Sequence, residues 1–222
     1  MDVYSGEKKQ QYLKEHSISN HFSFPIDTYI EVHDYQRNEW IIREGKKPDY
    51  LFYMVEGKAK IYTTHQNGKV SLINFIKPHD YIGEMELIHE SYYSKGIQVA
   101  ARSICFAIPF QECRTKLLED VTFLRELTTF LSKKATFMAT KSSQSQAFPL
   151  ENRLAHFILE LSDQGIYQEK HVTVCDYLGV SYRHLLHVIH QFCEKGFLEK
   201  EGRSFLIKDE QALLGLAEGL RH

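Results

Sequence analysis

The stretch TVCDYLGVSYRHLLHVIHQFC, residues 173–193, combines a regular apolar repeat with side chains that make directional hydrogen bonds. The apolar residues, spaced i, i+3, i+4 and i+7, are Leu185, Val188, Ile189 and Phe192. That spacing predicts the buried face of a helix. The hydrogen-bonding residues that point elsewhere are Tyr182, Arg183, His184, His187 and Gln191. Arginine can donate two bonds to guanine, and the others can bond to base edges or phosphates, so the pattern indicates a helix that reads the major groove of DNA.

Such a helix needs a neighbouring element that sets its angle on the duplex, and the residues just before it supply one. We expect Thr173 to cap a short first helix that ends at Gly179, where a residue without a side chain allows a left-handed turn. Ser181 then caps the second helix by accepting an amide N–H of its first turn. This arrangement is a helix-turn-helix, and we expect both capping residues to lie next to the DNA. Two amphipathic helices that merely pack together give a similar pattern.

Residues 196–207, GFLEKEGRSFLI, place two apolar runs on either side of a charged glycine turn. This order predicts a β-hairpin, which would form the wing of a winged helix. Arg203 lies in the turn and is expected to contact DNA. We therefore assign residues 148–222 to a winged helix-turn-helix domain whose partner is double-stranded DNA.

The charge of the chain does not by itself indicate a DNA-binding protein. The whole chain has 27 Lys and Arg against 29 Asp and Glu, and residues 148–222 hold eight against eleven. Attraction to phosphate is then local or weak. His184, His187 and His190 would add positive charge on the second helix if they were protonated, and otherwise they are exposed polar residues or phosphate contacts.

The composition, 43% hydrophobic and 25% charged, is that of a globular protein. The N-terminal residues lack the apolar core of a signal peptide, and no stretch approaches the roughly 20 apolar residues that span a bilayer. We therefore expect a cytoplasmic, bacterial protein with no membrane partner. The cysteines, Cys105, Cys113, Cys175 and Cys193, are far apart and form no CxxC pair, so their spacing indicates neither a zinc nor an iron–sulfur site. Oxidation of Cys193, at the end of the second helix, would alter DNA contact.

Short β-rich runs separated by turn residues occupy residues 29–109. The clearest predicted strands are Tyr29–Tyr35, Glu39–Arg43, Tyr50–Val55, Lys58–His65, Val70–Lys77, Ile97–Ala101 and Ile104–Ile108. A turn is expected at Glu56-Gly57 and a hairpin at Asn67-Gly68. These strands predict a jelly-roll-like β domain at residues 1–109, which makes the whole chain an α+β protein.

No glycine occurs from Phe110 to Gln164, and this interval has the apolar pattern of a long helix. One stripe, spaced like a coiled-coil seam, is Leu117, Val121, Leu124, Thr128, Leu131, Ala135 and Met138; a second is Phe123, Leu127, Phe130 and Phe137. One stripe can pack on the β domain while the other meets a second copy, so residues 110–147 are expected to form a two-fold homodimer. A helix buried on both faces of a monomer is the alternative. Residues Ser142, Ser143, Ser145 and Pro149 mark a hinge before a helix at residues 150–161.

The order of these parts resembles the Crp/Fnr superfamily of bacterial transcription regulators over nearly the whole chain. The motifs that carry the resemblance are Glu44-Gly45, residues 50–57, residues 80–84, residues 152–155 and residues 178–181. Residues 181–185 are also similar to the YeiL-like branch. The resemblance implies a sensor domain of the cyclic-nucleotide-binding type, an effector of unknown identity, and RNA polymerase as a partner if the protein activates transcription.

In relatives that bind cyclic AMP, a Gly-Glu pair is followed, eleven residues after the glycine, by Arg-Ser, which neutralises the cyclic phosphate. The corresponding positions of this chain hold Ser94 and Lys95, and a lysine one position late is a point charge where a bidentate donor is needed. A polar Thr-Ser pair that touches the purine is likewise replaced by Met and Ala. The expected effector pocket therefore comprises Gly83, Glu84, Ser94, Lys95, Met138 and Ala139, and these replacements argue against cyclic AMP.

Other signatures of the family also differ here. The chain lacks the N-terminal cysteine cluster of oxygen-sensing relatives, and no histidine is marked by a motif as a haem ligand. Many relatives present Arg-Glu and, four residues after that Glu, a second Arg, whereas this chain presents Tyr182, Arg183 and His187. The operator is therefore expected to differ from theirs, and to remain a palindrome with half-sites about 34 Å apart.

Two other interpretations of the same residues stay open. The protein could regulate without an effector, its pocket filled by Tyr92, Tyr93 and Met138. It could instead be a cupin-like metal enzyme, which needs a His-x-His pair, a carboxylate and a distant histidine. The histidines in question, His33, His65, His79 and His89, are scattered, and no nucleophile–base group is recognisable, so we expect neither an enzyme nor a metal site.

Overall fold

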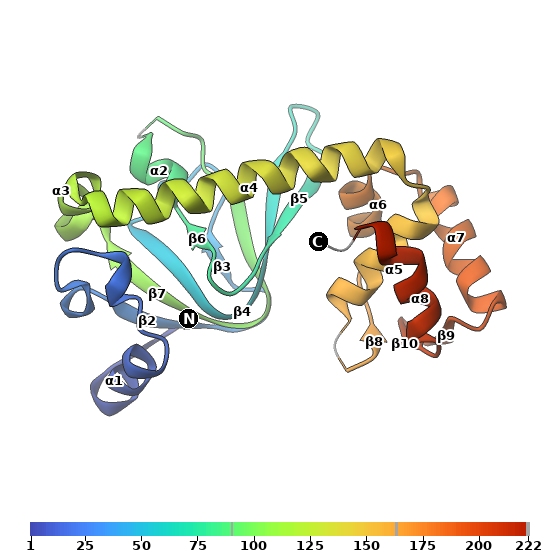
Figure 1. Cartoon of the computed structure of the whole chain (residues 1–222), viewed down its shortest axis with the longest axis horizontal. Helices are drawn as coiled ribbons and strands as arrows, with labels where there is room; N and C mark the ends of the chain where they lie inside the picture. Colours follow the sequence, from blue (N-terminus) through green and yellow to red (C-terminus); the bar gives the residue numbers. More distant parts are fainter. Residues whose placement is uncertain (90, 163, 221–222) are drawn as a thin grey trace. The chain divides into compact units, whose positions relative to one another are not determined.

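Strands occupy most of the first part of the chain and helices most of the second, as expected for an α+β protein (Figure 1). The structure, a computed structural model, describes residues 1–89, 91–162 and 164–220. The strands are β1 Asp2–Tyr4, β2 Glu31–Tyr35, β3 Trp40–Ile42, β4 Tyr50–Thr64, β5 Val70–Ile76, β6 Tyr81–Ile82, β7 Gly96–Pro109, β8 Ile166–Tyr167, β9 Leu198–Glu201 and β10 Ser204–Ile207. The α-helices are α1 Gly6–Glu15, α2 Glu84–Ile88, α3 Phe110–Glu119, α4 Val121–Ala147, α5 Leu150–Leu161, α6 His171–Leu178, α7 Tyr182–Glu194 and α8 Glu210–Ala217. The chain divides into two compact units, Met1–Lys134 and Ala135–His222, and the three segments proposed from the sequence stay a prediction.

The strands of the first unit form one antiparallel sheet in the order β1-β2-β7-β4-β5, with β3 on β7 and β6 on β4. Strands β4 and β7 pair with each other along almost their whole length. The sequence predicted two strands in each place, and that prediction is wrong. The expected turn at Glu56-Gly57 is instead a bulge within β4, where the register shifts and Gly57 adopts a φ of 94°.

Apolar residues on the two faces of this sheet form separate clusters. Leu51 and Tyr53 of β4 belong to a cluster with residues of the helices, and Phe52 belongs to a cluster on the other face. This alternation follows the two-residue period of a strand. Phe123 and Leu127 of α4 are buried in the first cluster, and Phe130 packs against it, as predicted for this stripe; Phe137 is exposed. Leu124 and Leu131 of the expected dimer seam also pack against this cluster.

The helical segment after Pro109 is two helices rather than one because Asp120 interrupts it with an extended backbone. One Asp120 oxygen accepts the N–H of Ser23 at 2.7 Å, and the other accepts the N–H of Thr122 at 2.9 Å. Leu117 therefore lies on α3, so its assignment to the long helix is wrong. It is fully buried in the core of the first unit, and we remove it from the expected dimer seam.

We expect Asp120→Ala to destabilise the first unit by about 2 kcal/mol, because a helix cap and a second N–H lose their acceptor. Burial raises the pKa of Asp120, and N–H donors including Ser23 and Thr122 lower it further than burial raises it. The contribution is therefore present near neutral pH and lost as the pH falls through the lowered pKa. Urea unfolding followed by Trp40 fluorescence measures the loss. Asp120→Ser keeps a capping oxygen and should lose less; equal losses would contradict the capping argument.

The second unit contains α5 to α8 and a small antiparallel sheet in the order β8-β10-β9. The predicted helix at residues 150–161 is confirmed as α5, which begins directly after Pro149. The expected break at the serines is wrong, since α4 continues to Ala147 and Ser145 donates its hydroxyl hydrogen to the Ser142 carbonyl oxygen inside the helix. Among the described residues, no helix is long and apolar enough to span a membrane.

Candidate nucleic-acid interface and sensor site

The two helices expected to form a helix-turn-helix are α6 and α7. Gly179 ends α6 in the left-handed conformation, with a φ of 67°, as predicted. The predicted cap at Thr173 is wrong, because α6 begins at His171 after Lys170 and places Thr173 inside the helix. Arg153 of α5 donates from Nη1 to the carbonyl oxygen of Leu178 at 2.8 Å, which satisfies one acceptor at the end of α6.

Helix α7 has one buried face and one exposed face. Ser181 caps it by accepting the N–H of His184 at 3.2 Å, as predicted. The buried residues are Leu185, Val188, Ile189 and Phe192, and the exposed ones include Tyr182, Arg183, His184 and His187. Gln191 is half-buried, and its Nε2 lies 3.2 Å from Nε2 of His187. The polar side chains that the sequence assigned to DNA reading therefore line one accessible surface.

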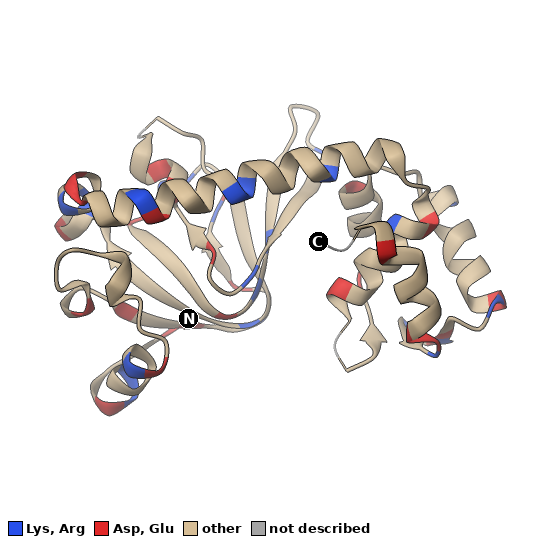
Figure 2. Cartoon of the chain, viewed as in Figure 1, with Lys and Arg blue, Asp and Glu red and all other residues tan. Residues whose placement is uncertain are grey.

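Charge is sparse on this surface. The only Lys, Arg, Asp and Glu residues in the sequence of α7 are Arg183 and Glu194, one near each end (Figure 2). His190 Nδ1 lies 3.4 Å from an oxygen of Glu194, one helical turn away. Recognition by α7 would then rest on hydrogen bonds more than on a field of positive charge.

The predicted hairpin after α7 is present as β9 and β10, which pair from Ser204↔Glu201 to Ile207↔Leu198. Arg203 is exposed at its turn, beside Gly202, which has a φ of 61°. Strand β8, which was not predicted from the sequence, pairs antiparallel with β10 and so adds a third strand to the hairpin. A strand of two residues is too short to show the alternation of polar and apolar residues by which strands are recognised in a sequence.

The Cys193 thiol is partly buried at the end of α7. Burial raises its pKa, and the nearby Lys200 offsets this only in part. The thiolate is the form that oxidants attack, so a raised pKa slows oxidation at neutral pH.

Lys141, near the end of α4, lies over the ring of Tyr177 on α6, with Nζ 3.3 Å from the ring centre. Burial lowers the pKa of Lys141 to about 8, although Glu160 attracts its positive charge. Sequence analysis missed this contact, because a lysine after a heptad seam is ordinarily solvated. It attaches the last turns of α4 to the first helix of the helix-turn-helix.

We expect Lys141 to make the second unit more stable as the pH rises from about 8 toward 10, since in this window the folded chain has released the lysine proton and the unfolded chain still holds it. The unfolded state then binds more protons, and the free energy of unfolding increases with pH. Urea unfolding followed by circular dichroism, at the two pH values, measures the gain. Thiols and phenols titrate in the same range, so Lys141→Met serves as the reference. An identical pH slope in the two proteins would contradict the assignment.

Of the expected effector residues of the first unit, Gly83 and Glu84 lie at the start of α2, whereas Ser94 and Lys95 contact Gly45 and Thr63. Gly83 has a φ of 88°, and a Cβ there would lie 2.9 Å from the Tyr50 carbonyl oxygen. Glu84 is 3% exposed and forms an ion pair with Lys134 of α4, with Nζ and Oε1 2.6 Å apart. Lys95 donates to the Thr63 hydroxyl at 3.0 Å. Lys134 was missed because its partner is fifty residues away in the sequence.

Ser94 is 1% exposed, and its hydroxyl has no hydrogen-bond partner among the described residues. Its backbone carbonyl oxygen accepts the N–H of Gly45 at 2.9 Å, which ties the two predicted motifs together. Met138 and Ala139, the other expected pocket residues, are exposed on the second-unit part of α4. Tyr93 is 63% exposed, and the expectation that Tyr92, Tyr93 and Met138 fill a pocket stays a prediction.

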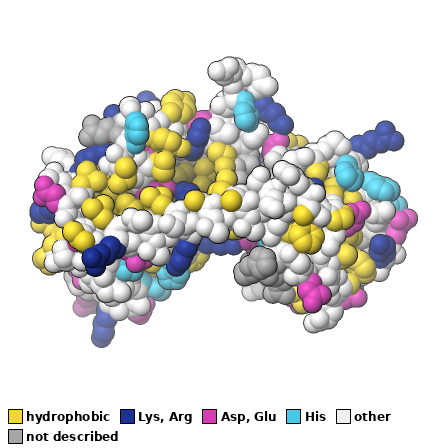
Figure 3. All heavy atoms as spheres, turned by 45° about the horizontal axis from the view of Figure 1, so that its top comes forward, with side chains coloured by type: hydrophobic (Ala, Val, Ile, Leu, Met, Phe, Trp, Pro, Cys, Tyr) yellow, Lys and Arg dark blue, Asp and Glu magenta, His cyan; other side chains and the backbone are white. Residues whose placement is uncertain are grey.

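Apolar side chains are exposed along α4, where the dimer seam was expected. The most exposed are Val121 and Met138, at 60% and 39%, and Phe137 of the other stripe is 43% exposed. The remaining seam residues, Leu124, Thr128, Leu131 and Ala135, are half-buried or exposed. Figure 3 shows hydrophobic side chains gathered over the first unit on the face that carries α4.

The histidines considered for a metal site have other neighbours in the structure. His79 Nδ1 lies 2.9 Å from the Tyr53 hydroxyl, and His65 Nε2 lies 3.1 Å from that of Ser71. In the described part of the chain, no group of three or more His, Cys, Asp and Glu side chains could hold a metal ion.

Known proteins resemble both units. Residues 32–120 match the model of the cyclic nucleotide-binding domain, and residues 152–216 match that of the Crp-like helix-turn-helix domain. Regulatory protein YeiL from Escherichia coli O157:H7 is 39% identical over 205 residues, which covers 92% of this chain and 94% of YeiL. The cAMP-activated global transcriptional regulator CRP from Salmonella typhimurium is 22% identical over 139 residues, 62% of this chain and 66% of CRP.

Solved structures show the same fold. A regulator of the Crp/Fnr family from Eubacterium rectale has a TM-score of 0.75 at 12% identity, over 96% of this chain and 95% of that one. Another from Thermus thermophilus has a TM-score of 0.70 at 18% identity, over 84% of this chain and 98% of that one. A winged helix-turn-helix together with a sensor domain of this type defines a DNA-binding transcription regulator. The identity to YeiL over most of the chain shows which kind: the chain belongs to the Crp/Fnr family.

Proposed function

We propose that the protein is a dimer that reads a palindromic operator through α7 and responds to an effector other than cyclic AMP. The observation that carries the DNA-reading part is the division of α7 into a buried apolar face and an exposed face with Tyr182, Arg183 and His187. A helix presented in this way fits the major groove. RNA polymerase would be a further partner if the protein activates transcription.

The dimer is supported by the apolar side chains exposed on α4. Val121 and Met138 of the expected seam are large hydrophobic residues that a monomer would leave in water. A second α4 would cover them, and the resulting two-fold symmetry would match a palindromic site. Sedimentation at micromolar concentration tests this part, and a monomer there would reject it.

The residues at the expected effector site favour a ligand other than cyclic AMP. No arginine stands at the positions that neutralise the cyclic phosphate in relatives, Lys95 is bonded to Thr63, and Glu84 is bonded to Lys134. A phosphodiester buried here without a bidentate cation would lose its hydration without compensation. Thermal-shift measurements test the proposal, since cyclic AMP should leave the melting temperature unchanged, whereas a true effector raises it. An unchanged melting temperature with every metabolite would instead favour regulation without an effector.

We expect Arg183→Ala to weaken binding to the operator by about 1–3 kcal/mol, because it removes a donor aimed at a base edge. The operator is first isolated by selection from random duplexes, and affinity is then measured by fluorescence anisotropy. The variant should also discriminate less at one base pair of each half-site. Arg37→Ala, which removes an exposed arginine of the first unit, is the matched control. Equal affinities for wild type and Arg183→Ala would reject α7 as the reading element.

A further inference from the structure

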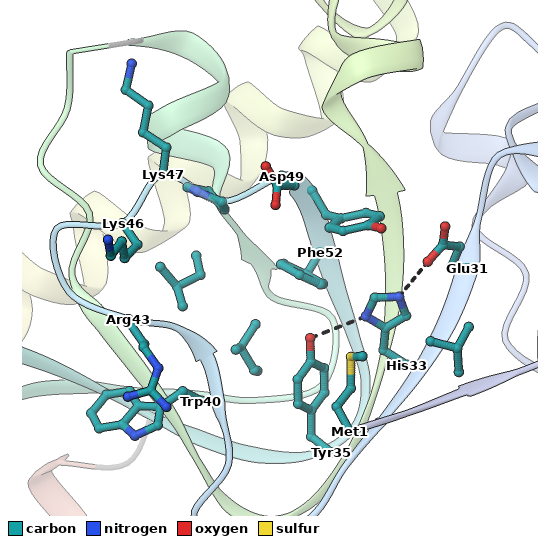
Figure 4. A pocket seen from close by; sticks show the side chains of 15 residues that line it. Met1, Glu31, His33, Tyr35, Trp40, Arg43, Lys46, Lys47, Asp49 and Phe52 are labelled. Atoms are coloured by element: carbon teal, nitrogen blue, oxygen red, sulfur yellow. Dashed lines mark hydrogen bonds and ion pairs between the residues drawn. The ribbon is translucent and has the colours of Figure 1, made fainter.

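A pocket of about 470 Å³ lies in the first unit between β2, β3, β4 and the loop at residues 43–49 (Figure 4). Its volume falls within the roughly 300–1,000 Å³ of small-molecule sites. Its lining includes none of the residues expected for the effector, Gly83, Glu84, Ser94 and Lys95. It is therefore a separate feature of the β domain, and it does not depend on DNA binding.

The buried wall of the pocket is built around His33, which is 3% exposed. Its Nε2 lies 2.8 Å from a carboxylate oxygen of Glu31, and its Nδ1 lies 3.3 Å from the hydroxyl of Tyr35. Because a carboxylate only accepts, Nε2 carries a hydrogen that it donates to Glu31. Figure 4 shows both interactions at the wall of the pocket. This wall is held in place before any ligand arrives.

Aromatic rings make up much of the rest of the lining. Tyr50 and Phe52 of β4 meet His33 edge to face, with ring centres 5.3 and 5.9 Å away. Trp40 of β3 also lines the pocket and is 37% exposed. Such a surface favours a flat apolar group, because rings pack well edge to face or with offset stacking.

The loop that bounds the pocket adds positive charge. Arg43, Lys46 and Lys47 all line it, and all three are exposed. Within the described ranges none of them forms an ion pair. The lining also holds two acidic residues, Glu31 and Asp49, so its formal charge is one positive. The rim therefore attracts an anion.

We propose that this pocket binds a small aromatic carboxylate, with its ring against Trp40 and Phe52 and its carboxylate at the cationic loop. Arginine can hold a carboxylate by two parallel hydrogen bonds, and lysine adds a point charge. A ligand with one negative charge and one ring fits this pocket, whose rim has a small net charge and whose wall is aromatic. A polyanion or an aliphatic acid would fit it less well.

Trp40 makes the test direct, because it is the chain's single tryptophan and it lines the site. The full-length protein is titrated with benzoate, and its tryptophan fluorescence is recorded. We expect a saturable change with benzoate, accompanied by a higher melting temperature. Benzamide keeps the ring without the charge, and acetate keeps the charge without the ring; each should bind at least about tenfold more weakly. Equal responses to benzoate and benzamide, or no response to benzoate, overturn the proposal.

Variants then locate the ligand within the protein. Arg43→Gln combined with Lys46→Gln should weaken benzoate binding about tenfold or more, because charged hydrogen bonds are lost. Two controls remove a cation outside the pocket: Arg37→Gln in the preceding turn, and Lys95→Gln at the family's effector position. Both should bind benzoate like the wild type. If Lys95→Gln abolishes binding while the double variant retains it, the ligand occupies the other site and the proposal is wrong.

Discussion

Gly57→Ala should destabilise the first unit by about 3 kcal/mol or more, since it combines backbone strain with overpacking. Gly57 lies at the bulge of β4 with a φ of 94°, and an added Cβ would collide with the side chain of Ser103 and the carbonyl oxygen of Arg102. Neither neighbour can move aside. Ser103 is fully buried, its hydroxyl oxygen accepts the N–H of Lys58 at 3.0 Å, and the hydroxyl donates to the carbonyl oxygen of Ala101 at 2.7 Å.

A second glycine separates the two causes of this loss. Gly68 also has a positive φ, 79°, but a Cβ there would meet nothing within 4 Å. Gly68→Ala therefore carries the backbone strain alone, roughly 1–2 kcal/mol. Urea unfolding followed by Trp40 fluorescence compares the two variants in the same unit. If Gly57→Ala and Gly68→Ala lose the same stability, the bulge tolerates a Cβ atom, and the predicted collision with Ser103 and Arg102 is wrong.

The same bulge explains where the sequence analysis of the β domain went wrong. Gly57 follows a charged residue and separates two apolar runs, which is also the pattern of a turn. The deciding fact is that both runs pair with the single strand β7, from Leu51↔Ile108 to Ile61↔Ile97. Pairing between residues 36 to 57 positions apart leaves no local signal, so a long bulged strand and two short strands give the same sequence pattern.

The helix-turn-helix was more predictable because its determinants are local. Gly179, Ser181 and the stripe on α7 act within a few residues of one another, and all three were confirmed. Thr173 was misplaced because α6 begins three residues earlier than predicted, after Lys170, without any side-chain cap. The contacts that the sequence could not supply, Arg153 with Leu178 and Lys141 with Tyr177, join elements distant in the chain.

Lys134→Met should cost the first unit about 2–3 kcal/mol, because it leaves a buried carboxylate without its cation; the 35% exposure of the lysine side chain keeps the loss below that of a fully buried pair. Glu84 is 3% exposed, and the Lys134 ammonium lies 2.6 Å from its Oε1. Methionine retains most of the apolar stem, so the loss reports on the charge rather than on packing. Lys134→Arg keeps the positive charge and should stay within about 1 kcal/mol of the wild type.

The double variant distinguishes two roles of the ion pair. Either the pair stabilises the contact between α4 and α2, or Lys134 only offsets the cost of burying the Glu84 charge. With Glu84→Gln and Lys134→Met together, no unpaired charge stays buried, and most of the lost stability should return. Urea unfolding followed by Trp40 fluorescence measures all the variants. If the double variant is as unstable as Lys134→Met alone, the ion pair is a genuine clamp between the helices. If Lys134→Met itself costs less than about 1 kcal/mol, water reaches Glu84 and the carboxylate is not truly buried.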